Sequence, residues 1–140
     1  MINDGLRLTG ALSISLNGVV VQEANNLVVT AGKSWVADRM NNANTVMTHM
    51  ALGTSDTAAA AGQTALVAEL DRNALTSTTV STNTIAYACT WAAGDGTGAI
   101  TEAGLFDADT SGDMLARTVF SVVNKAASDS ITITWTITIS

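Results

Sequence analysis

The clearest pattern in the chain is a strict alternation of apolar and hydroxyl side chains over residues 130–140. Successive side chains of a β-strand point to opposite faces, so this alternation predicts one long strand with an apolar face and a hydroxyl face. The apolar face carries Ile131, Ile133, Trp135, Ile137 and Ile139, and the other face carries Thr132, Thr134, Thr136 and Thr138. Such an apolar face needs a second sheet to cover it, so we expect a two-layer structure.

Similar alternation, broken by turn residues, predicts further strands along the chain. Asn17-Gly18 lies between two apolar runs, which is a strong signal for a tight hairpin. Residues 76–84, rich in Ser, Thr and Asn, are expected to hold a strand, a turn and a second strand. The other predicted strands cover residues 8–16, 19–21, 27–29, 48–52, 85–91, 100–106, 114–123 and 130–140.

One short helix is predicted over residues 30–40. Thr30 is a suitable cap, and Trp35, Val36, Arg39 and Met40 follow at helical spacing before Asn41-Asn42 ends the segment. Residues 55–63, rich in alanine, are expected to form a loop or a frayed helical turn. Residues 65–75 fit either a helix or a strand that starts at Asn73.

These elements predict an all-β fold of about eight strands and one short helix. Because strands do not alternate regularly with helices, a parallel sheet is disfavoured and an antiparallel β-sandwich, of the jelly-roll type, is expected. We expect residues 1–140 to form a single domain, with residues 1–6 as a flexible arm.

Charge and hydropathy exclude two classes of partner. The formal net charge is −6, and the six basic residues are scattered along the chain, so we expect no nucleic-acid binding. No apolar run approaches the roughly 20 residues that a membrane-spanning helix needs, so we expect no membrane partner. The first residues lack the pattern of a secretion signal, which predicts synthesis in the cytosol.

The residues that usually carry chemistry are scarce. His49 is the single histidine and Cys89 the single cysteine. We expect Cys89 to be a buried thiol and His49 a partly buried strand residue, and a zinc site would need carboxylates to complete it. No Gly-x-Ser-x-Gly turn is present, so no nucleophile has an evident base. We therefore expect no catalytic residue, no metal site, no cofactor and no enzyme activity.

Two short motifs resemble ligand-binding loops. Gly32-Lys33-Ser34 matches the end of a phosphate-binding loop, but Leu27 stands where that motif needs a glycine, so we expect an ordinary helical turn. Residues 107–113 place oxygen donors and a glycine as a calcium loop does, yet Thr118 stands at the position of its bidentate glutamate. An acidic hairpin turn is the simpler interpretation, and calcium binding stays the alternative.

The three tryptophans invite two interpretations. Trp91 and Trp135 share the parity of their strands' apolar side chains, so we expect both in the core. Trp35, on the predicted helix, is expected to be semi-exposed at a contact. The alternative is a lectin-like sugar-binding protein that uses Trp35 or the calcium-like loop.

Several segments together resemble small structural proteins of tailed bacteriophage particles. The resemblance covers about residues 50–140, overlaps a pattern of phage tail-collar and fibre proteins, and is strongest over residues 100–120. In length and predicted fold the chain is also similar to the jelly-roll capsid cement proteins of Bordetella-type phages. The segments are Ala51-Leu52-Gly53-Thr54, Thr64-Ala65-Leu66 with Glu69 and Arg72, Ile100-Thr101-Glu102-Ala103-Gly104-Leu105-Phe106-Asp107, Met114-Leu115-Ala116-Arg117-Thr118-Val119-Phe120 and the terminal strand.

The resemblance implies a cement or decoration protein on the exterior of the virion. Such a protein ties neighbouring subunits of the major capsid protein together and forms homodimers. The alternative is a tail-fibre, collar or baseplate component, with a trimer as the expected assembly and possible binding to a receptor. The arginines would pair with capsid carboxylates or form salt bridges within the chain. The expected interface residues are Met1, Ile2, Arg7, Trp35, Arg39, Arg72 and Arg117.

Overall fold

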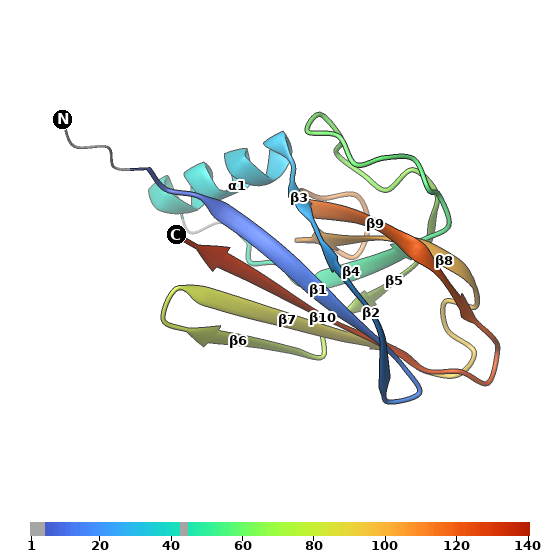
Figure 1. Ribbon diagram of the computed structural model, residues 1–140. Helices are drawn as coiled ribbons and strands as arrows, with labels where there is room; N and C mark the ends of the chain where they lie inside the picture. Colours follow the sequence, from blue (N-terminus) through green and yellow to red (C-terminus); the bar gives the residue numbers. More distant parts are fainter. Residues whose placement is uncertain (1–4, 43–44) are drawn as a thin grey trace.

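Two five-stranded antiparallel sheets pack face to face in the computed structural model, which describes residues 5–42 and 45–140 (Figure 1). Sheet A has the strand order β2-β1-β10-β7-β6, and sheet B has the order β3-β9-β8-β4-β5. The predicted all-β antiparallel sandwich is confirmed, and the described residues form ten strands in place of about eight. The elements are β1 Leu8–Leu16, β2 Val19–Asn25, β3 Leu27–Val28, α1 Thr30–Asn41, β4 His49–Gly53, β5 Glu69–Ala74, β6 Ser77–Ser81, β7 Thr84–Trp91, β8 Gly98–Phe106, β9 Met114–Lys125 and β10 Ile131–Ile139.

The terminal strand β10 is the central strand of sheet A. It pairs with β1 on one side and with β7 on the other, along nearly its whole length. Its predicted apolar face lies in the core from Ile131 to Ile137, whereas Ile139 is 41% exposed. Ile139 differs because the strand runs past the packed core there and lines an open groove at the end of the sandwich.

Strands that follow each other in sequence often change sheets. The chain passes from β7 in sheet A to the β8–β9 hairpin in sheet B and returns to β10, which pairs with β7. Crossovers of this kind are a feature of Greek-key and jelly-roll sandwiches. As a result, the core is built from side chains of both sheets, among them the fully buried Trp91 and Trp135, as the sequence predicts.

Helix α1 lies against β9 and close to one end of the sandwich. The predicted helix is confirmed, but Thr30 is its first residue and not its cap. The cap is Val29, which provides no side-chain hydrogen bond, and the Thr30 amide donates to the Ala61 carbonyl at 2.8 Å. Gly32 allows the close approach, because a Cβ there would collide with the Leu115 carbonyl.

The two residues with the most reactive side chains hold structural positions. Cys89 is fully buried in β7, as predicted, and burial raises the pKa of its thiol to about 12. His49 is half-buried at the start of β4, also as predicted, with Nδ1 2.7 Å from the Thr48 hydroxyl. Within the described ranges no helix is both long and apolar enough to span a membrane.

Candidate contact surfaces

The outer face of sheet B is closed by a buried ion pair. Glu102 on β8 and Arg117 on β9 are both fully buried. The Arg117 Nη2 and Nε atoms donate to Glu102 Oε2 at 2.6 and 2.9 Å, which gives a charge-assisted contact shielded from water. We expected Arg117 to meet carboxylates on a partner or within the chain, and the second arrangement is the one that forms. The prediction that Arg117 lies on an interface is wrong, because its side chain is not accessible.

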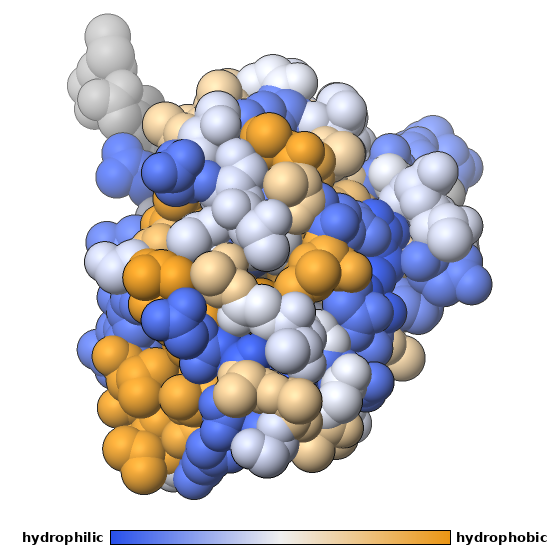
Figure 2. Space-filling view, turned by 90° about the vertical axis from the view of Figure 1, so that its right-hand side faces the viewer, coloured by the Kyte–Doolittle hydropathy of each residue, from blue (hydrophilic) through white to orange (hydrophobic). Residues whose placement is uncertain are grey.

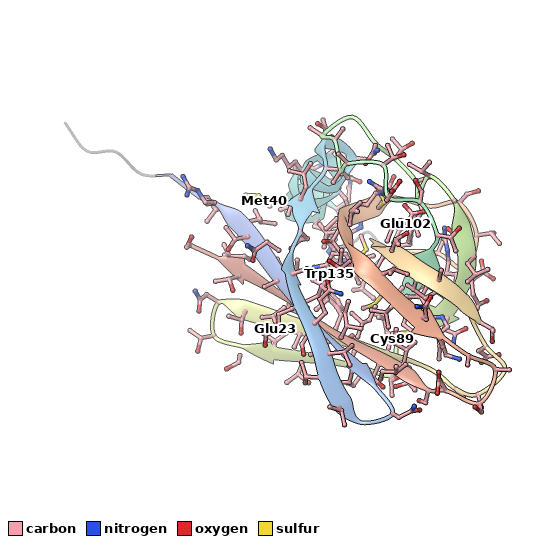
Figure 3. All side chains as sticks on the ribbon, turned by 45° about the vertical axis from the view of Figure 1, so that its right-hand side comes forward. Glu23, Met40, Cys89, Glu102 and Trp135 are labelled. Atoms are coloured by element: carbon pink, nitrogen blue, oxygen red, sulfur yellow. The ribbon has the colours of Figure 1, made fainter. Side chains whose placement is uncertain are left out.

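The same ion pair holds the loop over residues 54–68 against sheet B (Figure 3). The Glu102 carboxylate accepts hydrogen bonds from the amides of Ala68 and Val67 at 2.7 and 3.2 Å. Arg117 donates from Nη1 to the Gln63 side chain at 3.1 Å. The strand alternative for residues 65–75 is therefore the correct one, but β5 begins at Glu69 and not at Asn73.

A small apolar cluster lies beneath this loop, separate from the main core. Gly104 leaves room for the side chains of Leu66 and Phe106, which a Cβ would meet at 2.9 Å. Ala51, Leu66, Phe106 and Met114 of this cluster belong to the segments that resemble phage structural proteins. Their packing helps to fix the loop over sheet B. The cluster consists of Val29, Ala51, Leu66, Phe106 and Met114.

Arg72 fixes the neighbouring turn. Its side chain is only 7% exposed, lies over the Phe106 ring at 3.7 Å and forms a salt bridge with Glu69 at 2.7 Å. The guanidinium also donates to the carbonyls of Ala108 and Ser111 at 3.0 and 2.9 Å. All these contacts lie within the chain and leave little of the Arg72 side chain exposed, so its contact with a partner stays a prediction.

The acidic turn over residues 107–113 is organised by its own hydrogen bonds. Asp107 accepts from the Asp113 amide at 2.7 Å and from the Thr45 hydroxyl at 3.0 Å. Ser111 and Gly112 adopt positive φ to close the turn. Nowhere in the described part of the chain do three His, Cys, Asp or Glu side chains gather as a metal site would require.

The outer face of sheet A has the opposite character. We call it the hydroxyl face, because the strand register aligns rows of Ser, Thr and Ala across it, with Glu23 as its one charged residue among those described. A shallow depression of about 510 Å³ lies between Ala11, Glu23, Asn25 and Thr134. The face is formed by Thr9, Ala11, Ser13, Ser15, Val20, Glu23, Asn25, Ser77, Thr79, Ser81, Thr84, Ala86, Ala88, Thr90, Thr132, Thr134, Thr136 and Thr138.

An exposed apolar patch lies at the turn between β1 and β2. Val19, Val20 and Val21, which we call the valine tip, are 66%, 56% and 49% exposed. Figure 2 shows an apolar patch on the side of the molecule that carries this turn. The Gln22 side chain donates from Nε2 to the Ser121 carbonyl on β9, and its Oε1 accepts from the Ser121 amide, both at 2.8 Å. The strand that bears the tip is thereby fixed to the other sheet.

An apolar groove of about 300 Å³ lies between α1 and the β6–β7 hairpin. Trp35 lines it, half-buried as expected, and donates from Nε1 to the Thr45 carbonyl at 3.0 Å. Arg39 lies over the Trp35 ring at 5.8 Å, on the rim of the groove. Further lining residues include Leu8, Val36, Val80, Ile85 and Ile137.

The remaining predicted interface residues lie at the start of the chain. Arg7 is exposed, and its backbone exchanges hydrogen bonds with that of Ser140 at 2.7 and 2.9 Å. Met1 and Ile2 lie outside the described residues. The structure thus leaves Arg7, Trp35 and Arg39 at surface positions, and their contact with a partner stays a prediction.

No protein-family model, curated protein or solved structure matches the chain. The functional argument therefore rests on the geometry of the structure.

The sequence analysis did not identify Glu102 and Gln22 as anchoring residues. For Glu102 a signal existed, since a single carboxylate within the apolar run of residues 99–106 must find a partner when that strand is buried.

Proposed function

We propose that the protein is a structural, non-enzymatic virion protein, a cement or decoration protein on the outer surface of a phage head. In this role it stabilises contacts between subunits of the major capsid protein. The observation that carries the proposal is the hydroxyl face, a five-stranded surface with a single charged side chain among its described residues. It belongs to a sandwich whose opposite face is already closed by its own chain.

Hydroxyl side chains suit a surface that must be soluble before assembly and dry afterwards. Serine and threonine hydrogen-bond to water in the free protein and can exchange those bonds for bonds to a partner, without the cost of burying an unpaired charge. The valine tip adds apolar area to the same sheet. The net charge of −6 keeps an abundant exterior protein soluble and away from DNA.

Rigidity supports the same role. A protein that braces a shell has to keep its shape under load, and the Glu102–Arg117 pair fixes the longest loop to the sheet beneath it. A preordered surface also loses little conformational entropy on binding.

The alternative is a tail-fibre, collar or baseplate component, with receptor binding as a further role. The overlap of the resemblance over about residues 50–140 with the pattern of phage tail-collar and fibre proteins favours it. On this alternative the expected assembly is a trimer.

Imaging of particles separates the two locations. We expect density for the protein over the outside of the head, at a copy number comparable to that of the major capsid protein, measured by quantitative mass spectrometry of purified particles. A few copies confined to the tail would overturn the proposal and support the alternative.

Binding to capsids that lack the protein tests the surface. Thr134→Arg places a bulky charge in the middle of the hydroxyl face and should reduce binding at least about tenfold, because the charge would be buried without a partner. Thr110→Arg, at an exposed position of the 107–113 turn, is the matched control and should bind as the native protein does. Equal binding by both variants would show that the hydroxyl face is not the contact surface.

A further inference from the structure

Strand β6 is an open edge of sheet A. All five of its residues, Ser77–Ser81, are exposed, and none is charged or proline. It pairs with β7 without a register shift. An exposed and regular edge of this kind presents unpaired backbone groups to which another strand can add.

The other three edges of the sandwich are protected. Strand β2 has a register shift where it pairs with β1, carries Glu23, and is fixed to β9 through Gln22. Strand β3 has only two residues. Strand β5 carries Glu69, Asp71 and Arg72 and has a register shift against β4. These are the usual devices that prevent edge pairing, and β6 has none of them.

The β6–β7 hairpin is held in place at both ends. At the turn, the Asn83 side chain donates to the Ile139 carbonyl and the Ile139 amide donates to the Asn83 carbonyl, both at 2.9 Å. At the other end, the Thr76 amide donates to the Ala88 carbonyl at 2.7 Å. The edge is therefore preformed, so pairing would require little ordering of the strand.

We propose that β6 is a self-association interface, at which it pairs antiparallel with β6 of a second copy about a two-fold axis at Thr79. Pairing would join two five-stranded sheets into one continuous sheet of ten strands. The inference rests on the edge itself and does not depend on the proposed function.

The hairpin register decides which backbone groups face the open side. Ser81 and Thr84 close a two-residue turn, and hydrogen-bonded and non-hydrogen-bonded pairs alternate along an antiparallel ladder. The N–H and C=O groups of Thr78 and Val80 therefore point away from β7. With the axis at Thr79, Thr78 of each copy lies opposite Val80 of the other, and these residues exchange hydrogen bonds. Thr79 lies opposite its own counterpart in a close, non-hydrogen-bonded pair.

The strand is complementary to itself, which is why a second copy fits it. The axis pairs Ser77 with Ser81 and Thr79 with Thr79 on the hydroxyl face, and Thr78 with Val80 on the side of the apolar groove. Hydroxyl pairs and β-branched pairs are favourable neighbours across strands, and no like charges oppose each other. Val80, 69% exposed on the rim of the groove, would be covered by the second copy.

Sedimentation of the purified protein over a range of concentrations tests the proposal. We expect a concentration-dependent dimer. Thr79→Lys would place two lysines opposite each other and should weaken dimerisation at least about tenfold. A mixture of Thr79→Lys and Thr79→Glu should restore a mixed dimer, which shows that both variants are folded. Thr134→Lys, on the same face but away from the edge, is the control and should leave the dimer intact.

Cysteine crosslinking tests the register. Thr79→Cys should form an intermolecular disulfide on mild oxidation, because non-hydrogen-bonded pairs bring the two side chains close. Ser77→Cys and Ser81→Cys should crosslink to each other when mixed, but each should crosslink poorly alone. The native protein is the blank, since its one thiol is fully buried.

Three results would overturn the inference. They are a native protein that is monomeric at every concentration, a dimer that persists in Thr79→Lys, and a dimer lost in Thr134→Lys. The first would leave the edge to a strand of another protein, and the other two would place the self-contact elsewhere.

Discussion

The two outer faces of the sandwich belong to sheets of equal strand number, yet the chain treats them differently. Sheet B is covered by its own loop, with a buried ion pair and a small apolar cluster beneath. Sheet A presents rows of hydroxyl and methyl groups that no described segment covers. The charged and aromatic residues of the resemblance fix the covered face, whereas the open face consists of small side chains that need no partner within the chain.

Breaking the buried ion pair should have the largest effect. Arg117→Met leaves the Glu102 carboxylate buried without its counter-charge, and we expect a loss of about 3–5 kcal/mol in the free energy of unfolding, measured by urea denaturation. Protease cleavage within residues 54–68 should also become faster, because two of the loop's anchors are Gln63 and the amide of Ala68.

The double variant Glu102→Leu/Arg117→Met provides the control. Removing both charges should cost clearly less than the sum of the two single changes, because no unpaired charge stays buried. Additive losses would contradict the role that we give to the pair.

A glycine beneath the loop should have the next largest effect. A Cβ at Gly53 would collide with the Glu102 carboxylate and the Ala68 carbonyl, so Gly53→Ala should cost about 1–3 kcal/mol in the free energy of unfolding. Gly62 lies in the same loop and a Cβ there meets nothing within 4 Å, so Gly62→Ala should change stability by about 0.5 kcal/mol or less. If the two variants lost the same stability, the loop would not be packed as described.

Asp129, at the turns of sheet A, has an exposed carboxylate, in contrast to the buried carboxylate of Glu102. Asp129 accepts hydrogen bonds from the Asn17 side chain and the Ala126 amide, both at 2.9 Å, and these bonds lower the pKa of its carboxyl below the usual 3.8. A lowered pKa in the folded state means that the charged form stabilises the fold above the usual carboxyl pKa. That contribution is lost as the pH falls through the lowered value.

Asp129→Asn should therefore be less stable than the native protein at neutral pH, by much less than Arg117→Met. The difference should shrink as the pH falls below the usual carboxyl pKa of 3.8. Thermal melts across this pH range provide the measurement, and a difference that does not depend on pH would contradict the assigned role of the charge.

The smallest effect is expected on the hydroxyl face itself. Thr134 is exposed at the middle of β10, so Thr134→Val should change the free energy of unfolding by no more than about 0.5 kcal/mol, measured by the same urea denaturation. A larger loss would show that the face already has a stabilising partner within the chain and is not an open surface.

Side-chain alternation was enough to predict one layer of the fold. The parity of residues 131–137 placed Ile131, Ile133, Trp135 and Ile137 in the core, because a long strand with only one apolar face can pack in only one way. The helix was predicted within one or two residues for a similar reason. Its cap was not, because the Thr30 amide is satisfied by the distant Ala61 carbonyl.

The contacts that distinguish the two faces could not be read from the sequence. Glu102 and Arg117 meet across neighbouring strands whose register shifts between Ile100 and Glu102, and such a shift changes which residues lie opposite each other. Strand β6 was included in a polar segment, and its position at an edge depends on the order of strands in sheet A. Arg72 was expected to pair with carboxylates on a partner or within the chain. Its packing on Phe106 could not be predicted, because that contact joins residues far apart in sequence.

The central position of β10 has a consequence for how the protein is made. β1 is synthesised early but pairs with β10, so sheet A cannot be completed until residues 131–139 have left the ribosome. Pairings between such distant segments make folding slow, since a large loop must close before any contact is gained. During that delay β1 and β7 both lack their common neighbour, so a nascent chain stalled before residue 131 should depend on chaperones to avoid aggregation.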